Sequence, residues 1–200
     1  MTSLAAEKIQ KKSTLILASE SPRRLALLAQ AGIVPERVAP AFIDESVKKA
    51  EQPRAHALRL AGEKARAVAA DHDGFVLAAD TVVACGRRIL PKADDDAAVR
   101  ACLTLLSGRR HQVITAVALL TPDHKLRTRA VMTRVSFLRL TARDIDAYIE
   151  TREGVGKAGG YAIQGRAEIF VKEIGGSYSN VVGLPLSDTV QLLRGNGFTP

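Results

Sequence analysis

A single acidic residue interrupts the most apolar stretch of the sequence. Asp80 lies within residues 75–85 (FVLAADTVVAC), a run typical of a buried central strand. Burying an unpaired carboxylate is costly, so Asp80 needs a metal, a cation or a catalytic task. A structural ion pair would also satisfy the charge, but perturbed carboxylates gather at functional sites. We therefore interpret Asp80 as a candidate functional residue.

Two consecutive arginines lie at the expected start of the first helix. Residues 14–18 resemble a short strand, Ser21 is a suitable N-cap, and Pro22 suits the first helical position. Arg23 and Arg24 would then lie in the first turn, where the helix dipole disfavours each cation by about 0.3–1 kcal/mol. A bound phosphate would reverse that sign, because free backbone N–H groups and guanidinium groups both match its oxygens. Two solvated arginines remain the alternative.

Two further positions offer groups for an anion or metal site. Asp44 and Glu45 follow an expected strand at residues 38–43, where they are either part of a solvated turn or ligands for Mg²⁺. Lys64 falls on the apolar stripe of a helix expected over residues 53–70. Its ammonium either extends to solvent along the helix or points into a cleft to contact phosphate. The residues alone leave these alternatives open.

Composition limits the classes of function. The chain has 200 residues, 46% of them hydrophobic and 25% charged, which is typical of one globular domain. The net charge of +8 favours anionic partners, but dispersed basic residues and an aromatic content of 4% argue against nucleic-acid binding. Two isolated cysteines, no membrane-spanning run and no secretory signal predict a cytoplasmic protein without a membrane partner. We expect residues 1–13 to be a frayed extension and residues 14–200 to form one domain.

Periodicity and turn residues predict the elements that must position these side chains. Helices are expected over residues 94–106, 141–151 and 185–194, and strands over 89–92, 113–120, 131–140, 161–165 and 169–174. Residues 177–182 are expected to form a polar loop. The glycine-rich segment 154–161 matches neither a P-loop nor the G-x-G-x-x-G motif, so it indicates neither of those nucleotide folds.

Six stretches of the chain, in order, resemble the Maf family of nucleotide pyrophosphatases. They are LASESPRR at residues 17–24, EKA at 63–65, ADTVV at 79–83, SGRRHQV at 107–113, KAGGYAIQG at 157–165 and GSYSNVVGLP at 176–185. Each stretch is weakly specific by itself, whereas the common order over about residues 15–198 is a strong signal. The chain departs from the family at Ala93, where proline is usual, and at Glu20, which adds negative charge beside the arginine turn.

The resemblance implies a fold and a reaction. The fold is α/β, a long mixed twisted sheet flanked by helices, with two lobes around a nucleotide cleft as in inosine-triphosphate pyrophosphatases. The reaction is hydrolysis of a nucleoside triphosphate to its monophosphate and pyrophosphate with a divalent cation, Mg²⁺ or Mn²⁺. Asp-Thr after the central strand and Ile-Gln-Gly after the glycine-rich loop are similar to the dTTP/UTP branch. A nucleotide-sensing interaction protein and a basic nucleic-acid-binding module are the alternatives, and a homodimer is left open.

The resemblance also implies roles for individual residues. Asp80 matches the family's general base, and a metal-binding role for it is physically just as reasonable. Glu45 matches an acidic position that could hold the metal. The positions linked to base choice are Arg23, Thr81 and Gln164. The positions that contact phosphate are Ser21, Arg24, Lys64 and Lys92. A glutamine amide carries both a donor and an acceptor, as the edge of uracil or thymine requires.

Overall fold

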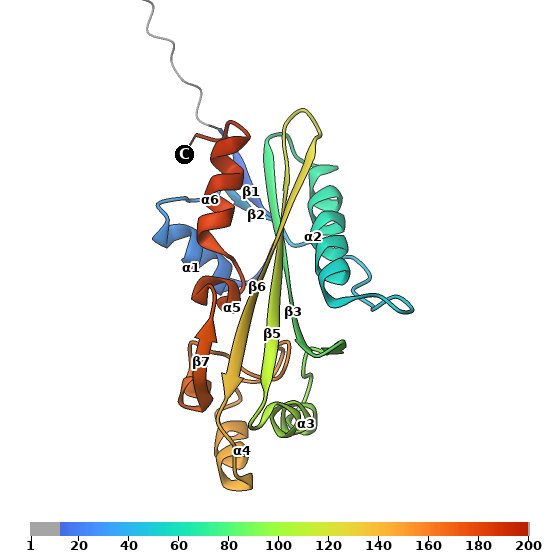
Figure 1. Ribbon diagram of the computed structural model, residues 1–200. Coiled ribbons are helices and arrows are strands. Elements are labelled where there is room, and N and C mark those ends of the chain that lie inside the picture. The colour runs from blue at the N-terminus through green and yellow to red at the C-terminus, as the bar shows by residue number, and fades with distance from the viewer. Residues whose placement is uncertain (1–12, 200) are drawn as a thin grey trace, which may run out of the picture.

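The computed structural model describes residues 13–199, which fold around one seven-stranded mixed sheet (Figure 1). The strands are β1 (Leu15–Leu17), β2 (Arg37–Val38), β3 (Phe75–Cys85), β4 (Arg88–Leu90), β5 (Arg110–Leu120), β6 (Leu126–Phe137) and β7 (Val171–Gly175). Their order is β2-β1-β3-β5-β6-β7, and β4 pairs with β3. Strand β1 is parallel to β2 and β3, whereas the other pairs are antiparallel. The expectation for residues 1–13 falls almost entirely outside the described residues.

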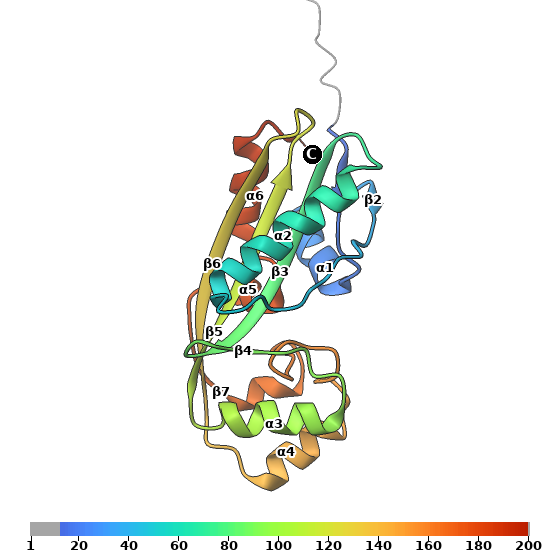
Figure 2. The same cartoon turned by 90° about the vertical axis from the view of Figure 1, so that its right-hand side faces the viewer.

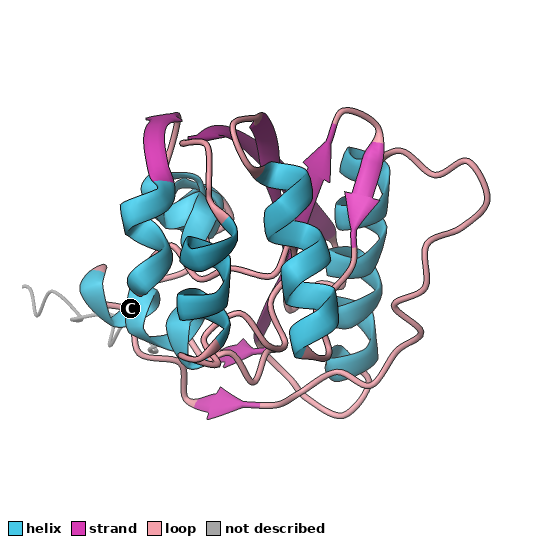
Figure 3. Ribbon diagram, turned by 90° about the horizontal axis from the view of Figure 1, so that it is seen from below, coloured by secondary structure: helices cyan, strands magenta, loops and turns pink. Residues whose placement is uncertain are grey.

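Helices cover both faces of the sheet and one end of it. They are α1 (Pro22–Gln30), α2 (Pro53–Ala69), α3 (Asp96–Leu106), α4 (Ala142–Ile149), the 3-10 helix η1 (Arg166–Phe170), α5 (Tyr178–Val182) and α6 (Leu186–Gly195). Helix α2 lies on one face, and α1, α5 and α6 lie on the other (Figures 1 and 2). Helices α3 and α4 lie at the far end of the long strands, which Figure 3 shows from below. The predicted α/β fold, with a mixed sheet flanked by helices, is confirmed.

Strand β3 is buried on both faces, as its apolar sequence predicts. Phe75, Leu77, Ala79 and Val83 belong to one core cluster, and Val76, Ala78 and Val82 belong to the other, which contains the alanine stripe of α2. By this alternation Asp80 faces α2, and Thr81 faces the side of α1 and α5. On one edge, β1 pairs only with residues 75–77 of β3 and β4 only with residues 83–85. Residues 78–82 of β3 therefore have no paired strand on this edge in the described part of the chain, and Asp80 and Thr81 lie at this gap in the sheet.

Several expected local structures differ from those observed. The strand expected over residues 131–140 spans Leu126–Phe137, and the strand expected over 169–174 begins at Val171, after η1. Strand β2 covers only Arg37–Val38, since the chain turns away after Ala39 N donates to Leu17 O (3.0 Å). Residues 161–165 form a turn, closed by Gly165 N and Ala162 O (3.0 Å), and not a strand. Residues 178–182 form helix α5, which Ser177 caps through Asn180 N (3.2 Å). These features depend on tertiary contacts and single caps, which carry no periodic signal.

A buried histidine packs among aromatic side chains at the start of β5. His111 is 2% exposed, its Nε2 contacts the hydroxyl of Tyr161 (2.8 Å), and its ring packs edge-on against Phe137 and Tyr161. Its Nδ1 has no hydrogen-bond partner within residues 13–199. Burial therefore lowers the pKa of His111 to about 4.

This lowered pKa predicts a pH-dependent stability. The unfolded state binds a proton near pH 6.5 and the folded state only near pH 4, so stability is complete above pH 6.5 and declines as pH falls towards 4. Between pH 7 and pH 5 the free energy of unfolding is expected to fall by about 2 kcal/mol. Urea unfolding at both pH values, beside a His111→Gln variant without the titrating ring, measures this. An equal decline in the variant would assign it to other groups.

Candidate active site

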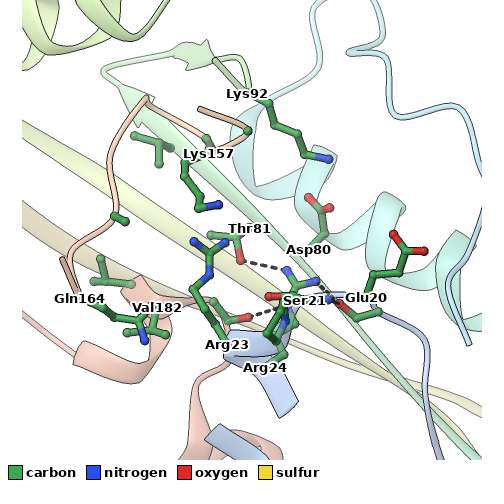
Figure 4. A pocket seen from close by; sticks show the side chains of 18 of the residues that line it. Glu20, Ser21, Arg23, Arg24, Asp80, Thr81, Lys92, Lys157, Gln164 and Val182 are labelled. Atoms are coloured by element: carbon green, nitrogen blue, oxygen red, sulfur yellow. Dashed lines mark hydrogen bonds between the residues drawn. The ribbon is translucent and has the colours of Figure 1, made fainter. Parts of the chain in front are cut away.

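A cavity of about 920 Å³ opens at the gap beside β3 (Figure 4). This is large enough for a nucleotide-sized ligand. It is lined by the turn between β1 and α1, by β3, by the chain after β4, by residues 152–165 and by the end of α5. Nine residues predicted from the sequence line it: Ser21, Arg23, Arg24, Glu45, Lys64, Asp80, Thr81, Lys92 and Gln164. Side chains more than 140 positions apart in the sequence are therefore brought into one cavity.

Two carboxylates and two ammonium groups alternate along one side of the cavity. Lys64 Nζ lies 2.7 Å from Asp80 Oδ1 and 2.7 Å from Glu45 Oε1, and Lys92 forms an ion pair with the other oxygen of Glu45. Lys64 and Asp80 are both buried. The ammonium of Lys64 thus points into the cavity and not to solvent, and it is held between the two acids. One of its three N–H donors remains for a ligand.

The electrostatic effect of this arrangement is clearest at Glu45. Burial would raise the pKa of its carboxyl group, but the hydrogen bonds and charges of Lys64 and Lys92 outweigh burial and lower the pKa to about 2. Glu45 is therefore ionised at neutral pH despite being half-buried. It keeps both lysine side chains on the same side of the cavity.

The guanidinium group of Arg24 is fixed from three directions. Its Nε donates to Gly183 O (2.9 Å), Nη1 to Ser19 Oγ (2.9 Å) and Nη2 to Thr81 Oγ1 (3.3 Å). Of the five N–H donors of an arginine, one on each terminal nitrogen remains, which is the pair that grips two oxygens of a phosphate. Burial lowers the pKa of Arg24, and the charge of Asp80 opposes that effect.

Thr81 belongs to a hydrogen-bond relay whose direction is determined. Thr115 Oγ1 lies 2.9 Å from Asn180 O, which can only accept, so the hydroxyl of Thr115 donates there. Thr81 Oγ1, at 3.0 Å from Thr115 Oγ1, must then donate to it and accept from Arg24. The hydroxyl hydrogen of Thr81 is therefore already donated to Thr115. Towards a ligand this oxygen can act only as an acceptor.

Like Arg24, the cavity residues Arg23 and Lys157 have no acidic partner within residues 13–199. Arg23 Nε is buried without a hydrogen-bond partner, and burial lowers the pKa of Arg23. Lys157 lies beside Arg23 (Figure 4), and burial, followed by the charge of Arg23, lowers the pKa of this lysine. An anion bound between them would relieve both effects. The sequence-based prediction omitted Lys157, although it begins the KAGG stretch.

The backbone of the glycine-rich loop explains how Lys157 reaches the cavity. Ala93 N donates to Lys157 O (3.0 Å), and Gly156 N donates to Ala93 O (2.7 Å), which fastens the loop to the chain after β4. Gly159 has a φ of +72°, and a Cβ there would lie 2.8 Å from Val83. Only glycine fits this position without displacing the central strand.

The start of α1 and the Gln164 turn complete the cavity. Ser21 is the N-cap of α1, but its side chain makes no capping hydrogen bond, so its hydroxyl is available to an anion. Pro22 has no N–H and Arg24 N donates to Ser21 O (3.1 Å), which leaves the N–H of Arg23 as the free backbone donor of this turn. Gln164 lies exposed in its turn at the opposite side of Arg23 from Asp80 (Figure 4). The cavity thus has the uncharged amide of Gln164 on one side. Basic side chains line much of the remainder: Arg23, Arg24, Lys64, Lys92 and Lys157.

The donor set fits a divalent cation that also binds phosphate. No group of three or more acidic, histidine or cysteine side chains that could enclose a metal occurs in the part of the chain that the structure describes. However, Asp80 and Glu45 converge on one ammonium at 2.7 Å each. Mg²⁺ is commonly held by one or two carboxylates together with substrate phosphate oxygens. This pair satisfies that requirement.

Comparison with known proteins places these features in a family. The family described as Maf-like protein matches residues 14–196. A "dTTP/UTP pyrophosphatase" of Paramagnetospirillum magneticum is 58% identical, over 94% of this chain and 100% of that protein. A "dTTP/UTP pyrophosphatase" of Caulobacter vibrioides is also 58% identical, over 93% of this chain and 97% of that protein. The resemblance predicted from the six stretches is confirmed.

One solved structure shares the fold. The chain resembles a HAM1 protein from Coxiella burnetii with a TM-score of 0.51 and 15% identity, over 92% of this chain and 99% of that one. At this identity the likeness concerns the fold alone. No helix among residues 13–199 has the length and apolar character needed to cross a membrane.

Proposed function

The chain belongs to the Maf-like protein family, and on that premise we propose that it hydrolyses nucleoside triphosphates to the monophosphate and pyrophosphate, with dTTP and UTP preferred. Relatives at 58% identity that are named dTTP/UTP pyrophosphatases support the substrate class. The observation that carries the chemistry is the buried Asp80, held by Lys64 in a cavity where Arg23, Arg24 and Lys157 form no ion pair within residues 13–199. A carboxylate beside concentrated positive charge suits attack on a polyanion.

The cations of the cavity bind and orient the triphosphate. Arg24 presents two N–H donors in a fixed orientation, and Arg23 and Lys157 are uncompensated charges. Lys64 and Lys92 are each paired with a carboxylate, but each has donors left for phosphate oxygens. Because Arg24, Lys64 and Lys92 are held before the substrate arrives, they need little reorganisation when negative charge develops on the leaving pyrophosphate.

Asp80 acts as the general base in the proposed reaction. Its Oδ1 is held by Lys64, while Oδ2 makes no hydrogen bond within the described residues and is free to accept a proton. The oxygen of a water molecule attacks the α-phosphorus, the bond between that phosphorus and the bridging oxygen to the β-phosphorus breaks, and pyrophosphate leaves. The water's proton passes to Asp80. The lysine and arginine side chains neutralise the charge on the leaving group.

Asp80 and Glu45 would hold Mg²⁺ or Mn²⁺ in this proposal. When bound, the ion supplies neutralisation of phosphate charge and polarisation of the P–O bonds. Lys64 keeps the two carboxylates at one point of the cavity before the nucleotide enters. Loss of activity in EDTA, restored by Mg²⁺ or Mn²⁺ and not by Ca²⁺ alone, is the expected behaviour.

Gln164, on the opposite side of Arg23 from Asp80, provides base selection together with Arg23 and Thr81. A glutamine amide can rotate by half a turn, so Gln164 matches either the keto edge of uracil or the amino edge of cytosine. Arg23 can only donate, and Thr81 can only accept, because its hydrogen is committed to Thr115. Groups of fixed polarity favour a base with carbonyl oxygens and an N3–H. They support the preference for uracil and thymine over cytosine.

Pyrophosphate release from a panel of nucleoside triphosphates tests the proposal. We expect release from dTTP and UTP that exceeds release from CTP, GTP and 7-methyl-GTP by at least tenfold in kcat/KM. Release from a purine nucleotide instead would keep the chemistry and reject the base assignment. Saturable binding of dTTP without any release would identify a nucleotide sensor. Salt-dependent binding of nucleic acid without release would favour a basic binding module.

A further inference from the structure

The turn that carries Gln164 is held by its backbone and not by Gln164 itself. The Gln164 side chain is exposed and has no hydrogen-bond partner in the part of the chain that the structure describes. Its position therefore depends on what anchors the residues on either side. Ile163 is buried, and Ala162 N donates to the hydroxyl of Tyr148 (3.0 Å). These contacts fix the N-terminal half of the turn, and the buried Ala167 anchors the segment that follows it.

Glu153 anchors the C-terminal half. Its Oε2 accepts a hydrogen bond from Arg166 N at 2.8 Å, across 13 positions of the chain. The carboxylate also packs directly on the turn, because a Cβ added to Gly165 would lie 2.0 Å from Glu153 Oε2. Gly165 thus has no side chain where Glu153 needs the space. The carboxylate of Glu153 thus occupies the space where a side chain of residue 165, directly after Gln164, would lie.

The backbone before Glu153 is arranged to direct it there. Arg152 has a φ of +60°, a conformation that costs a non-glycine residue free energy and that persists where the surroundings enforce it. Its guanidinium group is tied to Asp96 (2.6 Å), and Glu153 N donates to Thr151 Oγ1 (3.2 Å). These contacts turn the chain after α4 so that Glu153 lines the cavity.

We propose that Glu153 is a positioning residue, which sets the place of Gln164 by accepting the Arg166 N–H and filling the space beneath Gly165. This inference rests on the proposed function, since Gln164 is taken to contact the base. Glu153 provides a hydrogen-bond acceptor for Arg166 N and a side chain that fills the space beside Gly165. A glutamine side chain can provide both. Glu153 therefore differs from Asp80 and Glu45, whose negative charge is required.

The first test separates position from charge. Glu153→Ala is expected to raise KM for dTTP and UTP about tenfold and to reduce the preference for them over CTP, with kcat changed less than about threefold. Glu153→Gln keeps the acceptor and should stay within about twofold of the wild type in both constants. Glu168→Ala, an exposed glutamate in the same segment, is the matched control. Equal losses in Glu153→Gln and Glu153→Ala would show that the charge matters and would overturn the proposal.

The second test does not depend on activity. Hydrogen exchange of the Arg166 amide should accelerate at least tenfold in Glu153→Ala and remain slow in Glu153→Gln and Glu168→Ala. Unchanged exchange in Glu153→Ala would overturn the proposal. If the wild type released no pyrophosphate, the proposed function would fail, while Arg166 exchange would still decide whether Glu153 holds the turn. The two failures are thus distinguishable.

Discussion

Replacing Asp80 by asparagine is expected to lower kcat for pyrophosphate release by about 10²- to 10⁴-fold, the range of general acid–base catalysis. Asparagine has the same shape and retains an oxygen for the 2.7 Å contact with Lys64, but it cannot accept a proton from water. KM for dTTP should change little, because Arg24, Arg23 and Lys157 are untouched. Steady-state kinetics measures both constants.

Two further measurements sharpen this prediction. Asp71→Asn, an exposed aspartate outside the cavity, should behave as the wild type. Recovery of Asp80→Asn at high Mn²⁺ would identify Asp80 mainly as a metal ligand, whereas a loss independent of metal concentration would identify it as the base. A variant within tenfold of wild-type kcat would remove Asp80 from the reaction.

Lys64→Met is expected to be the second most damaging substitution. Methionine fills the buried space of the lysine but removes the ammonium that lies 2.7 Å from both Asp80 and Glu45. Two carboxylates then face each other without their shared cation. We expect kcat/KM to fall at least 100-fold and the free energy of unfolding at pH 7 to fall by about 3 kcal/mol, as for other broken buried pairs.

The same substitution should change the acid behaviour of the protein. With one of its two lysines lost, the pKa of Glu45 rises from about 2 towards its ordinary value. In the wild type, ionised Glu45 contributes stability that is complete above about pH 4.5 and is lost as pH falls towards 2, so the stability deficit of the variant should be largest at pH 7 and should narrow as pH falls from 4.5 to 3. Urea unfolding between pH 3 and 7 measures this, with the exposed Lys49→Met as control. A variant with wild-type activity and stability would contradict the role given to Lys64.

The features that follow local patterns could be predicted from the sequence. The apolar run over Phe75–Cys85 gives the bounds of β3, and the alanine-rich stripe of α2 places Lys64 on the buried face beside Asp80. Thr141 and Asp144 form the predicted capping box of α4. Strand and helix periods place Asp80 and Lys64 on buried faces, whereas their assignment to one nucleotide site came from the resemblance to the Maf family.

Features that depend on distant contacts could not be predicted. Lys157 reaches the cavity because its loop is fastened to Ala93, and Glu153 reaches Arg166 because Arg152 adopts a positive φ. Helix α5 forms around a buried Asn180 that bonds to Val113 O (3.0 Å). None of these contacts has a periodic signature. The only local feature that could have indicated a role for Lys157 is its place within the glycine-rich segment 154–161.

The position of water attack tests the central claim most directly. Hydrolysis of dTTP or UTP in ¹⁸O-labelled water, followed by mass spectrometry of the products, shows which phosphorus receives the oxygen. Attack at the α-phosphorus directed by Asp80 predicts the label in the monophosphate and unlabelled pyrophosphate. Label in pyrophosphate, or release of labelled orthophosphate, would show attack at another phosphorus and would contradict the proposed arrangement of the site.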